Sequence, residues 1–467
     1  MCGIVGIFDH AEAATLAYLG LFAQQHRGQE SAGIVSANNE KLKIHLSMGQ
    51  VSDIFSQENL ARISGNHAIG HVRYSTFGES HIKNCQPFIV NYAKGAMAVA
   101  HNGNIVNAKT IRRNFEDEGA IFQSNMDTEV IMHLLAKSRQ DSLIDRLIES
   151  LNKLEGAFSL LFLTKDCMIA ARDSSGFRPL VLGKKDGAPV VASETCAFDL
   201  IGAEFEREIE PGEIVVFKDG KVESYFYQQN KQKKNHCIFE YVYFARPDSH
   251  IFNRDVYEIR KGFGNMLAKE SSVEADVVIP VPDSGVPAAI GYSHASGIPF
   301  EMGLVRNHYV GRTFIEPEQS IRHFGVRVKL NPVKNIFKGK KVILVDDSIV
   351  RGTTSRKIVT MVRDAGASEV HFRISSPPTK WPCFYGLDTP SRAELISAKK
   401  SLEEIKTFIQ ADSLQYLSVD SLYWFDKKNE KEWFCDACFT GKYPIGRPEV
   451  SKVIRAETGE ELMPLEV

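Results

Sequence analysis

Continuous runs of apolar residues mark two segments in the second half of the chain. Residues 341–345 and 277–281 each carry such a run, rich in valine and isoleucine. Strands buried on both faces, as in a parallel sheet, have this pattern rather than strict alternation. The first run ends in two aspartates and a turn rich in hydroxyl groups, after which residues 357–365 have helical character. The pattern predicts a parallel sheet with a loop of candidate chemistry at its edge.

Shorter apolar segments in the first half lead into polar turns that contain glycine. An apolar run over residues 96–100 is followed by His-Asn-Gly-Asn at 101–104. Residues 25–33 form another polar turn with glycines, and Arg73 follows a short apolar stretch. Apolar positions with helical spacing come soon after Asp127. These turns hold the candidate catalytic residues of this half.

Composition narrows the class of protein. The chain has 467 residues, enough for two or three domains with complete cores, and 43% of them are hydrophobic. A net charge of -2 gives no electrostatic case for nucleic acid, and no apolar run reaches the length of a membrane span. Only Met1 precedes Cys2, which leaves no room for a signal peptide, so we expect a cytoplasmic protein that binds neither nucleic acid nor membrane. The polar, basic stretch 227–236 has the composition of a linker.

Cys2 is a candidate nucleophile because of its position in the chain. Once Met1 is removed, the thiol and the α-amine belong to the same residue. An α-amine titrates at about pH 8, far below lysine, so it can act as the base for the adjacent thiol at neutral pH. The alternative is a small buried cysteine at the start of a strand. The residues that follow favour the nucleophile.

Polar residues behind Cys2 supply the groups that such a nucleophile needs. The guanidinium of Arg73 can hold a carboxylate through two hydrogen bonds. The Asn102 amide beside the backbone N–H of Gly103 provides the donors of an oxyanion hole. Asp127 either holds an ammonium group or caps the helix that follows it. Each has an ordinary structural explanation, namely a salt bridge, a hairpin turn or a helix cap, but their order behind a cysteine at position 2 is specific.

Residues 2–235 resemble the class II glutamine amidotransferases, which are N-terminal-nucleophile hydrolases that release ammonia from glutamine. The resemblance implies an αββα sandwich with Cys2 as nucleophile and base. It assigns the binding of glutamine to four residues: Arg27, Arg73, Thr76 and Asp127. Of these, Arg73 and Asp127 would hold the carboxylate and the amine of glutamine, and Arg27 would lie on the lid side.

The strand, acidic pair and helix start at 341–357 together suit a phosphorylated sugar. Backbone N–H groups and the dipole at a helix N-terminus can hold a phosphate, and adjacent carboxylates can hold ribose hydroxyls and face a divalent cation. The alternative is that the two aspartates only solvate the end of a strand. The string VILVDDSIVRGTTS at 342–355 resembles the phosphoribosylpyrophosphate (PRPP) signature of the type I phosphoribosyltransferases. The resemblance assigns these residues to PRPP: Asp346, Asp347, Ser348, Arg351, Gly352, Thr353, Thr354, Ser355 and Lys329.

Two further segments fit the same resemblance. The loop after the run 277–281 is rich in proline, glycine and serine, and its Ser284 is placed by the resemblance on magnesium, together with Asp346 and Asp347. A long loop from 304 to 332 carries a set of cations: Arg306, Arg312, Arg322, Arg327 and Lys329. Long loops in compact domains are either functional or disordered. This one resembles a lid that closes over PRPP, and the alternative is a solvated loop.

Eight cysteines raise a separate question. They stand at positions 2, 85, 167, 196, 237, 383, 435 and 438. A cytosolic compartment argues against a disulfide framework. Cys435 and Cys438 form a CxxC pair, a spacing seen both in metal centres and in redox motifs. The spacing alone does not show whether Cys237 and Cys383 join them.

The whole chain resembles the amidophosphoribosyltransferase family, which joins both activities. The resemblance implies glutamine-dependent conversion of PRPP to 5-phosphoribosylamine, with release of glutamate and pyrophosphate, at the first committed step of purine synthesis. It implies a mixed α+β and α/β fold, in which an αββα domain over 2–235 precedes a phosphoribosyltransferase domain over 236–467 with a C-terminal helical segment. Ammonia would cross an internal passage. Mg²⁺, purine nucleotide feedback inhibitors and a homo-oligomer, by resemblance a tetramer, complete the expected partners.

One branch of that family, of the Bacillus type, implies a structural 4Fe-4S cluster. The string CxxCFTGKYP from Cys435 onward is similar to the end of its cysteine set. The resemblance therefore assigns the cluster to Cys237, Cys383, Cys435 and Cys438. Structural zinc is the alternative, because tetrahedral thiolate sets hold both. The branch often begins with a cleaved propeptide, whereas only Met1 precedes Cys2 here.

Two other functions can be compared with this interpretation. Another class II amidotransferase, such as a glucosamine-phosphate or asparagine-synthesising enzyme, would share residues 2–130 but has no use for the string at 342–355. A nucleotide-sensing regulator without catalysis would not need Cys2 or the pair Asp346 and Asp347. The sequence therefore favours the coupled enzyme.

Overall fold

The computed structural model describes most of the chain. The described residues are 2–38, 40–74, 80–228, 233–307, 330–387, 389, 391–427 and 430–445. Several residues of the predicted sites lie outside them: Thr76, Arg312, Arg322, Arg327 and Lys329. Within the described residues, no helix is long and apolar enough to cross a membrane.

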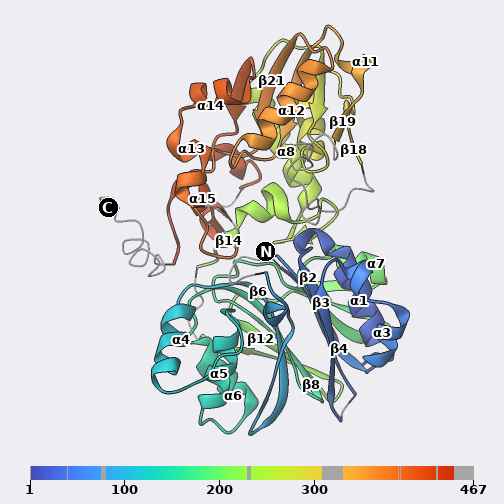
Figure 1. Ribbon diagram of the computed structural model, residues 1–467, viewed down its shortest axis with the longest axis vertical. Helices are drawn as coiled ribbons and strands as arrows, with labels where there is room; N and C mark the ends of the chain where they lie inside the picture. The colour runs from blue at the N-terminus through green and yellow to red at the C-terminus, as the bar shows by residue number, and fades with distance from the viewer. Residues whose placement is uncertain are drawn as a thin grey trace.

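The first half is built on two antiparallel sheets (Figure 1). The first sheet has the order β11 (Glu204–Glu208), β9 (Val181–Lys185), β10 (Ala188–Ala192), β1 (Gly3–Ile7), β4 (His67–Arg73), β2 (Ser31–Ala37) and β3 (Leu42–Met48). The second has the order β13 (Lys221–Phe226), β12 (Glu213–Lys218), β8 (Cys167–Arg172), β7 (Gly156–Leu163), β6 (Gly95–Ile105) and β5 (Phe88–Tyr92).

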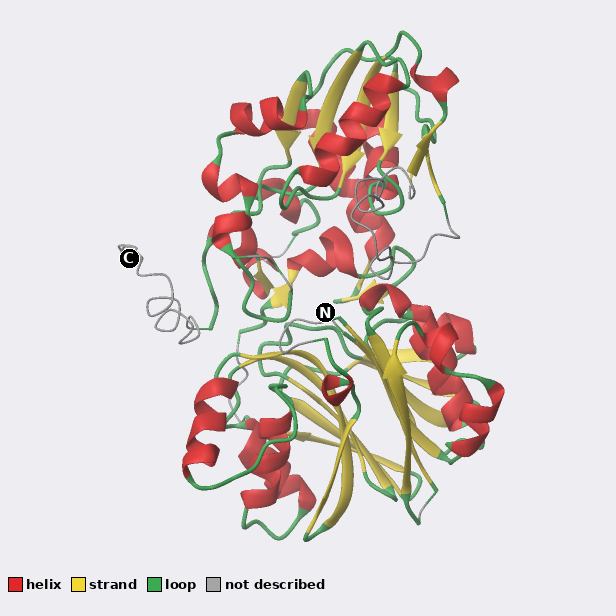
Figure 2. Ribbon diagram, viewed as in Figure 1, coloured by secondary structure: helices red, strands yellow, loops and turns green. Residues whose placement is uncertain are grey.

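The two sheets face each other across a wholly apolar core. Ile4 and Ile69 of the first sheet pack with Leu161 and Val215 of the second, and none of them is exposed. Helices α1 (Ala13–Ala23) and α7 (Cys196–Ile201) cover the outer face of the first sheet. Helices α4 (Ala108–Asp117), α5 (Glu129–Lys137) and α6 (Leu143–Leu151) cover the second. Two short helices, α2 (Val51–Ile54) and α3 (Gln57–Arg62), follow β3 and pack into the core under α1. The layers in Figure 2 are therefore the expected αββα sandwich.

The second half contains the predicted parallel sheet. Its order is β17 (Val277–Pro280), β20 (Lys341–Asp346), β21 (Glu369–Ile374) and β22 (Ser413–Tyr416), and all three pairings are parallel. Alternate residues of β20 enter different cores: Ile343 and Val345 pack on the side of α8 (Val256–Glu270) and α9 (Val286–Ser296). Val342 and Leu344 pack on the side of α12 (Thr353–Asp364) and α14 (Leu402–Ile409). Both faces are covered, which explains the continuous apolar run.

Shorter elements join the two halves. The strand β14 (His236–Cys237) pairs in parallel with β23 (Phe434–Cys435), close to α15 (Ala437–Thr440). A π-helix, Glu240–Phe244, follows β14 and is mostly buried. The other short elements of this half are β15 (His250–Ile251), β16 (Arg254–Asp255), β18 (Leu304–Arg306), β19 (Leu330–Pro332), α11 (Lys334–Phe337) and α13 (Ile396–Lys399). The start of the chain lies at the junction of the halves (Figure 1).

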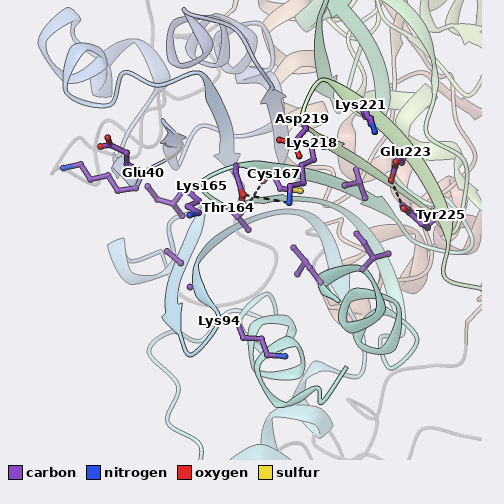
Figure 3. Close-up of a pocket in the computed structure, with 18 of the residues that line it drawn as sticks. Glu40, Lys94, Thr164, Lys165, Cys167, Lys218, Asp219, Lys221, Glu223 and Tyr225 are labelled. Carbon is purple, nitrogen blue, oxygen red and sulfur yellow. Dashed lines mark hydrogen bonds and ion pairs between the residues drawn. The ribbon is translucent and has the colours of Figure 1, made fainter. Parts of the chain in front are cut away.

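An open cavity of about 940 Å³ lies at the other end of the sandwich. It is formed by the hairpin turns 93–96, 164–167 and 218–221, where lysines and carboxylates are mixed (Figure 3). Lys218, for example, is 4.0 Å from Asp166. Gly95 stands at the cavity end of β6, whereas Asn102 stands near the opposite end of that strand. This cavity is therefore remote from Cys2.

Candidate active sites and a cysteine cage

Cys2 is held at both of its backbone polar atoms. Its nitrogen, which becomes the α-amine after removal of Met1, donates to Asn102 Oδ1 at 3.2 Å. Its carbonyl oxygen accepts from Arg27 Nε at 2.9 Å, and its Sγ lies 3.8 Å from the carbonyl oxygen of Tyr74. Cys2 precedes β1 and Asn102 belongs to β6, so the two sheets meet at Cys2. The structure thus brings together three groups that the sequence had singled out: the Cys2 thiol, the Cys2 nitrogen and the Asn102 amide.

The Asn102 side chain has a donor to spare. Asn102 is fully buried, and its Nδ2 has no hydrogen-bond partner among the described residues. A buried amide without a partner costs about 1–3 kcal/mol, so such a group needs an explanation. Gly103 follows on the strand, where a Cβ would lie only 2.0 Å from the carbonyl oxygen of Ala157. The close approach requires glycine and keeps its backbone beside the spare amide donor, as an oxyanion hole needs.

Arg73 and Asp127 are the residues expected to bind glutamine, and the side chains of both contact other groups of the protein. Arg73, at the end of β4, is buried and lies 2.7 Å from Glu30 Oε1. Asp127 Oδ2 accepts from the backbone N–H of Ile105 at 2.9 Å, and its Oδ1 is 3.6 Å from His101 Nδ1. Burial acts to raise the pKa of Asp127, but His101 outweighs it and holds the pKa below its usual value. The carboxylate therefore remains charged.

The helix-cap explanation of Asp127 does not describe its contacts. Helix α5 begins at Glu129, its N-cap is Thr128, and no side chain caps it. Asp127, two residues before the helix, instead contacts two residues of β6, the backbone N–H of Ile105 and the side chain of His101. The salt-bridge explanation of Arg73, by contrast, is present in the structure as the contact with Glu30. A substrate carboxylate at Arg73 would add to this pair or displace it.

Arg27 does not lie on a lid, which corrects the expectation for this residue. Its side chain is buried beneath Cys2, where its guanidinium contacts Glu194 and lies 2.9 Å from Glu240 Oε1. Burial acts to lower the pKa of Arg27, but Glu240 and Glu194 outweigh it and raise the pKa. The sequence showed an arginine in a polar turn and gave no sign of carboxylates about 170 and 210 residues away that would bury it.

The acidic pair lies at the carboxyl end of β20, as predicted. Asp347 Oδ1 accepts from Ser284 Oγ at 2.6 Å, so the structure brings together the residues assigned to magnesium. The backbone N–H of Asp347 donates to Asp346 Oδ1 at 2.9 Å, and both side chains are buried. Burial raises the pKa of each carboxyl group above its usual value, and for Asp346 the adjacent Asp347 adds to it. Two buried carboxylates side by side are suited to a divalent cation.

The loop after the acidic pair ends at the N-terminus of α12. Gly352 has a φ of +74°, and a Cβ there would lie 2.9 Å from the side chain of Ile396. The first residues of the helix are Thr353, Thr354 and Ser355, whose backbone N–H groups lack partners within the helix and suit an anion. Arg351 instead pairs with Glu394 at 2.9 Å on the surface.

Tyr243 and Arg260 both interact electrostatically with Asp347, and sequence reasoning missed both. Half of the Tyr243 surface is open, yet desolvation by the surrounding protein raises its pKa to about 12, with further contributions from Asp347 and Tyr74. Burial lowers the pKa of Arg260 to about 10, although Asp347 counteracts it. Tyr243 therefore senses both the acidic pair and the residue that follows Arg73. No local sequence motif indicates this role of Tyr243, because its position depends on the folding of the whole chain.

Four cysteines from three segments that are distant in sequence surround one small cavity. They are Cys237, Cys383, Cys435 and Cys438. Cys237 and Cys435 are direct partners of the β14–β23 pairing, and the Cys438 carbonyl accepts from the backbone N–H of Trp381 at 3.1 Å. Burial raises the pKa of Cys237 to about 11 and that of Cys438 well above its usual value. We name this set the cysteine cage.

The spacing of the sulfurs within the cage is wide. No three of these four described thiols lie within 4.8 Å of one another. A single tetrahedral zinc ion, with Zn–S bonds of about 2.3 Å, would require its sulfurs to be about 3.8 Å apart. The described thiols therefore do not have the spacing of a tetrahedral zinc site.

Comparisons with known proteins agree with the class of each half. The model of a glutamine amidotransferase domain matches residues 71–199, and the model of a phosphoribosyl transferase domain matches residues 259–412. The amidophosphoribosyltransferase of Bacillus subtilis is 50% identical over 95% of this chain and 94% of its own length. A chloroplastic amidophosphoribosyltransferase of Arabidopsis thaliana is 54% identical over 96% of this chain and 79% of its own length.

A solved structure superposes on nearly the whole chain. The glutamine PRPP amidotransferase of B. subtilis has a TM-score of 0.90 and 49% identity, covering 96% of this chain and 98% of its own. The fold and the two sites therefore define a glutamine amidotransferase joined to a phosphoribosyltransferase. More specifically, the chain belongs to the amidophosphoribosyltransferase family. It catalyses the glutamine-dependent conversion of PRPP to 5-phosphoribosylamine, which begins purine synthesis, and the family requires Mg²⁺.

Proposed function

We propose that Cys2 is the nucleophile of the glutaminase half and that its own α-amine is the base. The thiolate attacks the side-chain carbonyl of glutamine, the oxyanion is held by Asn102 Nδ2 and Gly103 N–H, and ammonia leaves as a glutamyl thioester forms. Water then releases glutamate. The observation that carries this proposal is the spare Asn102 donor on the same amide that holds the Cys2 nitrogen.

Glutamine recognition is assigned to Arg73 and Asp127. The Arg73 guanidinium would hold the substrate carboxylate and Asp127 its ammonium, as their opposite charges require. Thr76 lies outside the described residues and remains assigned to glutamine. We assign Arg27 to the support of Cys2 rather than to glutamine, because its described contacts are with protein groups.

In the second half, PRPP is assigned to Asp346, Asp347 and the loop from Ser348 to Ser355. The N-terminus of α12 would hold the 5-phosphate and the carboxylates the ribose hydroxyls. Asp346, Asp347 and Ser284 fit a magnesium ion, since they place hard oxygen donors together. When bound, the ion would neutralise the charge of the pyrophosphate leaving group. Lys329, outside the described residues, remains assigned to PRPP.

The proposed route for ammonia passes Tyr243. This residue lies in electrostatic contact with Tyr74, beside the glutaminase centre, and with the acidic pair. Ammonia would therefore travel from Cys2 past Tyr74 and Tyr243 to C1 of PRPP. The route needs no bulk water, which would protonate ammonia and remove its nucleophilic lone pair.

The cysteine cage is proposed to hold a 4Fe-4S cluster with a structural role. Four thiols lining one closed cavity at wide spacing support a cluster over the alternative, a single zinc ion. The cluster would link three separate segments and take no part in amide transfer, which involves no redox step.

The other expected features remain proposals as well. The domain boundary is placed between 235 and 236, where β14 leaves the sandwich and pairs with β23. The B. subtilis structure is a complex with ADP and GMP, which supports purine nucleotides as feedback inhibitors here. We also propose a homo-oligomer, a tetramer by resemblance, and a cytoplasmic location, which eight unpaired cysteines suit.

One experiment tests the division of labour. Pyrophosphate release is measured with glutamine and with ammonia for the wild type and for Cys2→Ala. Glutamine-dependent synthesis should vanish while ammonia-dependent synthesis persists. Intact mass should show Cys2 as the first residue of active protein. Active protein that retains Met1 would exclude the α-amine as base.

A further inference from the structure

Four buried charged side chains form a network beneath Cys2: Arg27, Arg178, Glu194 and Glu240, none more than 1% exposed. Arg27 NH1 contacts Glu194 and lies 3.1 Å from Glu240 Oε2, while its NH2 lies 2.9 Å from Glu240 Oε1. Arg178 NH1 lies 3.2 Å from the same Oε1. The two cations balance the two carboxylates, and removal of one buried charge leaves its partner uncompensated.

Glu240 is the member that the second half of the chain contributes. It begins the π-helix, whose backbone is held by the buried Arg260. Arg260 Nε donates to the Tyr241 carbonyl at 2.6 Å, and its NH2 donates to the Ala245 carbonyl at 2.8 Å. The position of the Glu240 carboxylate is therefore set by the phosphoribosyltransferase half.

The network reaches the nucleophile through one hydrogen bond. Arg27 Nε donates to the Cys2 carbonyl at 2.9 Å, while Asn102 accepts from the Cys2 nitrogen. The orientation of Arg27 fixes one side of Cys2, and Asn102 fixes the other. The relation of the thiol and amine to the oxyanion donors thus depends on both side chains.

We propose that Glu240 is a positioning residue for the Cys2 nucleophile, acting across the junction of the halves through Arg27. The proposal rests on the role of Cys2 proposed above. A neutral side chain at 240 would remove the carboxylate that Arg27 shares with Arg178 and would leave Glu194 as the only carboxylate of the network in contact with Arg27. Arg27 would then turn toward Glu194, and the Cys2 carbonyl would move with it. A displacement of about 1 Å at a reacting group costs on the order of 100-fold in rate.

The test measures glutaminase kcat, KM for glutamine and ammonia-dependent synthesis in the full-length holoenzyme carrying Glu240→Gln. We expect kcat to fall roughly 10- to 100-fold with KM unchanged within about twofold, because substrate contacts are intact. Ammonia-dependent synthesis should change less than about threefold, since it does not use Cys2. Labelling of Cys2 by a diazo ketone analogue of glutamine should slow with kcat.

Glu213→Gln is the matched control. Glu213 is equally buried and ion-paired, to Arg207 at 2.7 Å, with Ser224 and the Glu210 N–H as its other partners. It should lower thermal stability without changing kcat or the labelling rate. Should Glu240→Gln fail to fold, Arg27→Lys serves instead: the charge stays, the Nε contact to Cys2 is lost, and the same fall in kcat is expected.

Two results would overturn the proposal. One is a glutaminase kcat within threefold of wild type in folded Glu240→Gln and Arg27→Lys proteins. The other is an equal loss of glutamine-dependent and ammonia-dependent synthesis, which would mean that Glu240 acts only on stability. Retained glutaminase in Cys2→Ala would instead refute the role of Cys2, so the two failures are distinguishable.

Discussion

Replacement of Asn102 by alanine separates catalysis from stability. The substitution removes the spare Nδ2 donor and the acceptor that holds the Cys2 nitrogen. Loss of one oxyanion donor costs about 10²- to 10³-fold in kcat, equal to about 2.7–4 kcal/mol of transition-state stabilisation. Loss of the acceptor leaves the buried Cys2 nitrogen without this hydrogen bond, which costs about 1–3 kcal/mol of stability, and removal of the buried Nδ2 without a partner returns about 1–3 kcal/mol. The free energy of unfolding should therefore change little.

The assay compares glutamine hydrolysis with ammonia-dependent pyrophosphate release, alongside a thermal melt. Asn104→Ala is the matched control, because Asn104 lies on the same strand and its Nδ2 already donates to the Phe384 carbonyl at 2.9 Å. The control should lose some stability and keep most of its glutaminase activity. Retention of more than about one tenth of kcat by Asn102→Ala would refute the oxyanion assignment. An equal loss of ammonia-dependent activity would do so as well.

Three other substitutions test separate parts of the molecule. Asp347→Asn should reduce PRPP turnover with glutamine and with ammonia by at least about 100-fold while basal glutaminase survives; near-normal ammonia-dependent rates would exclude the loop as the PRPP site. Burial lowers the pKa of His71 to about 3. Below about pH 6.5 the unfolded chain therefore binds a proton at this histidine that the folded chain does not bind, so the free energy of unfolding decreases as the pH decreases. In urea titrations between pH 7 and pH 5, the free energy of unfolding of His71→Gln should decrease by about 2 kcal/mol less than that of the wild type. An unchanged pH dependence would contradict this. Cys435→Ser should give iron-poor, colourless and poorly soluble protein, whereas the wild type purified without air should be brown, and stoichiometric zinc in active wild type would favour the alternative metal.

Features that depend on a local sequence pattern could be predicted from the sequence. The run before Asp346 did become a central strand of a parallel sheet, because covering both faces of a strand requires apolar residues at every position. The proximity of Asn102 to Cys2 followed from the roles that a thiol nucleophile needs, not from any spacing. Ser284 reached Asp347 for a geometric reason: the carboxyl ends of adjacent parallel strands share one edge of the sheet.

Contacts between distant segments could not be predicted. The carboxylates that bury Arg27 come from a loop of the first half and from the π-helix of the second, and neither segment carries a local signal. Tyr243 has an ordinary aromatic sequence context, and its position between the sites depends on how the two halves pack. The joining of Cys383 to the CxxC pair likewise depends on the path of the chain through the second half. In each case the partner is specified by tertiary structure alone.

The pairing of β14 with β23 has a consequence for the order of events during synthesis. Cys237 and Cys435 are direct neighbours in the fold although about 200 residues separate them, so the proposed cluster, by linking them, would remove about 5 kcal/mol of unfolded-chain entropy. During translation, at about 5–20 residues per second, Cys237 would emerge at least roughly ten seconds before its partner. The αββα sandwich can therefore complete its core on the ribosome while the cage waits for the last part of the chain. Insertion of the proposed cluster would therefore be one of the last steps of folding, after most of the chain has been synthesised.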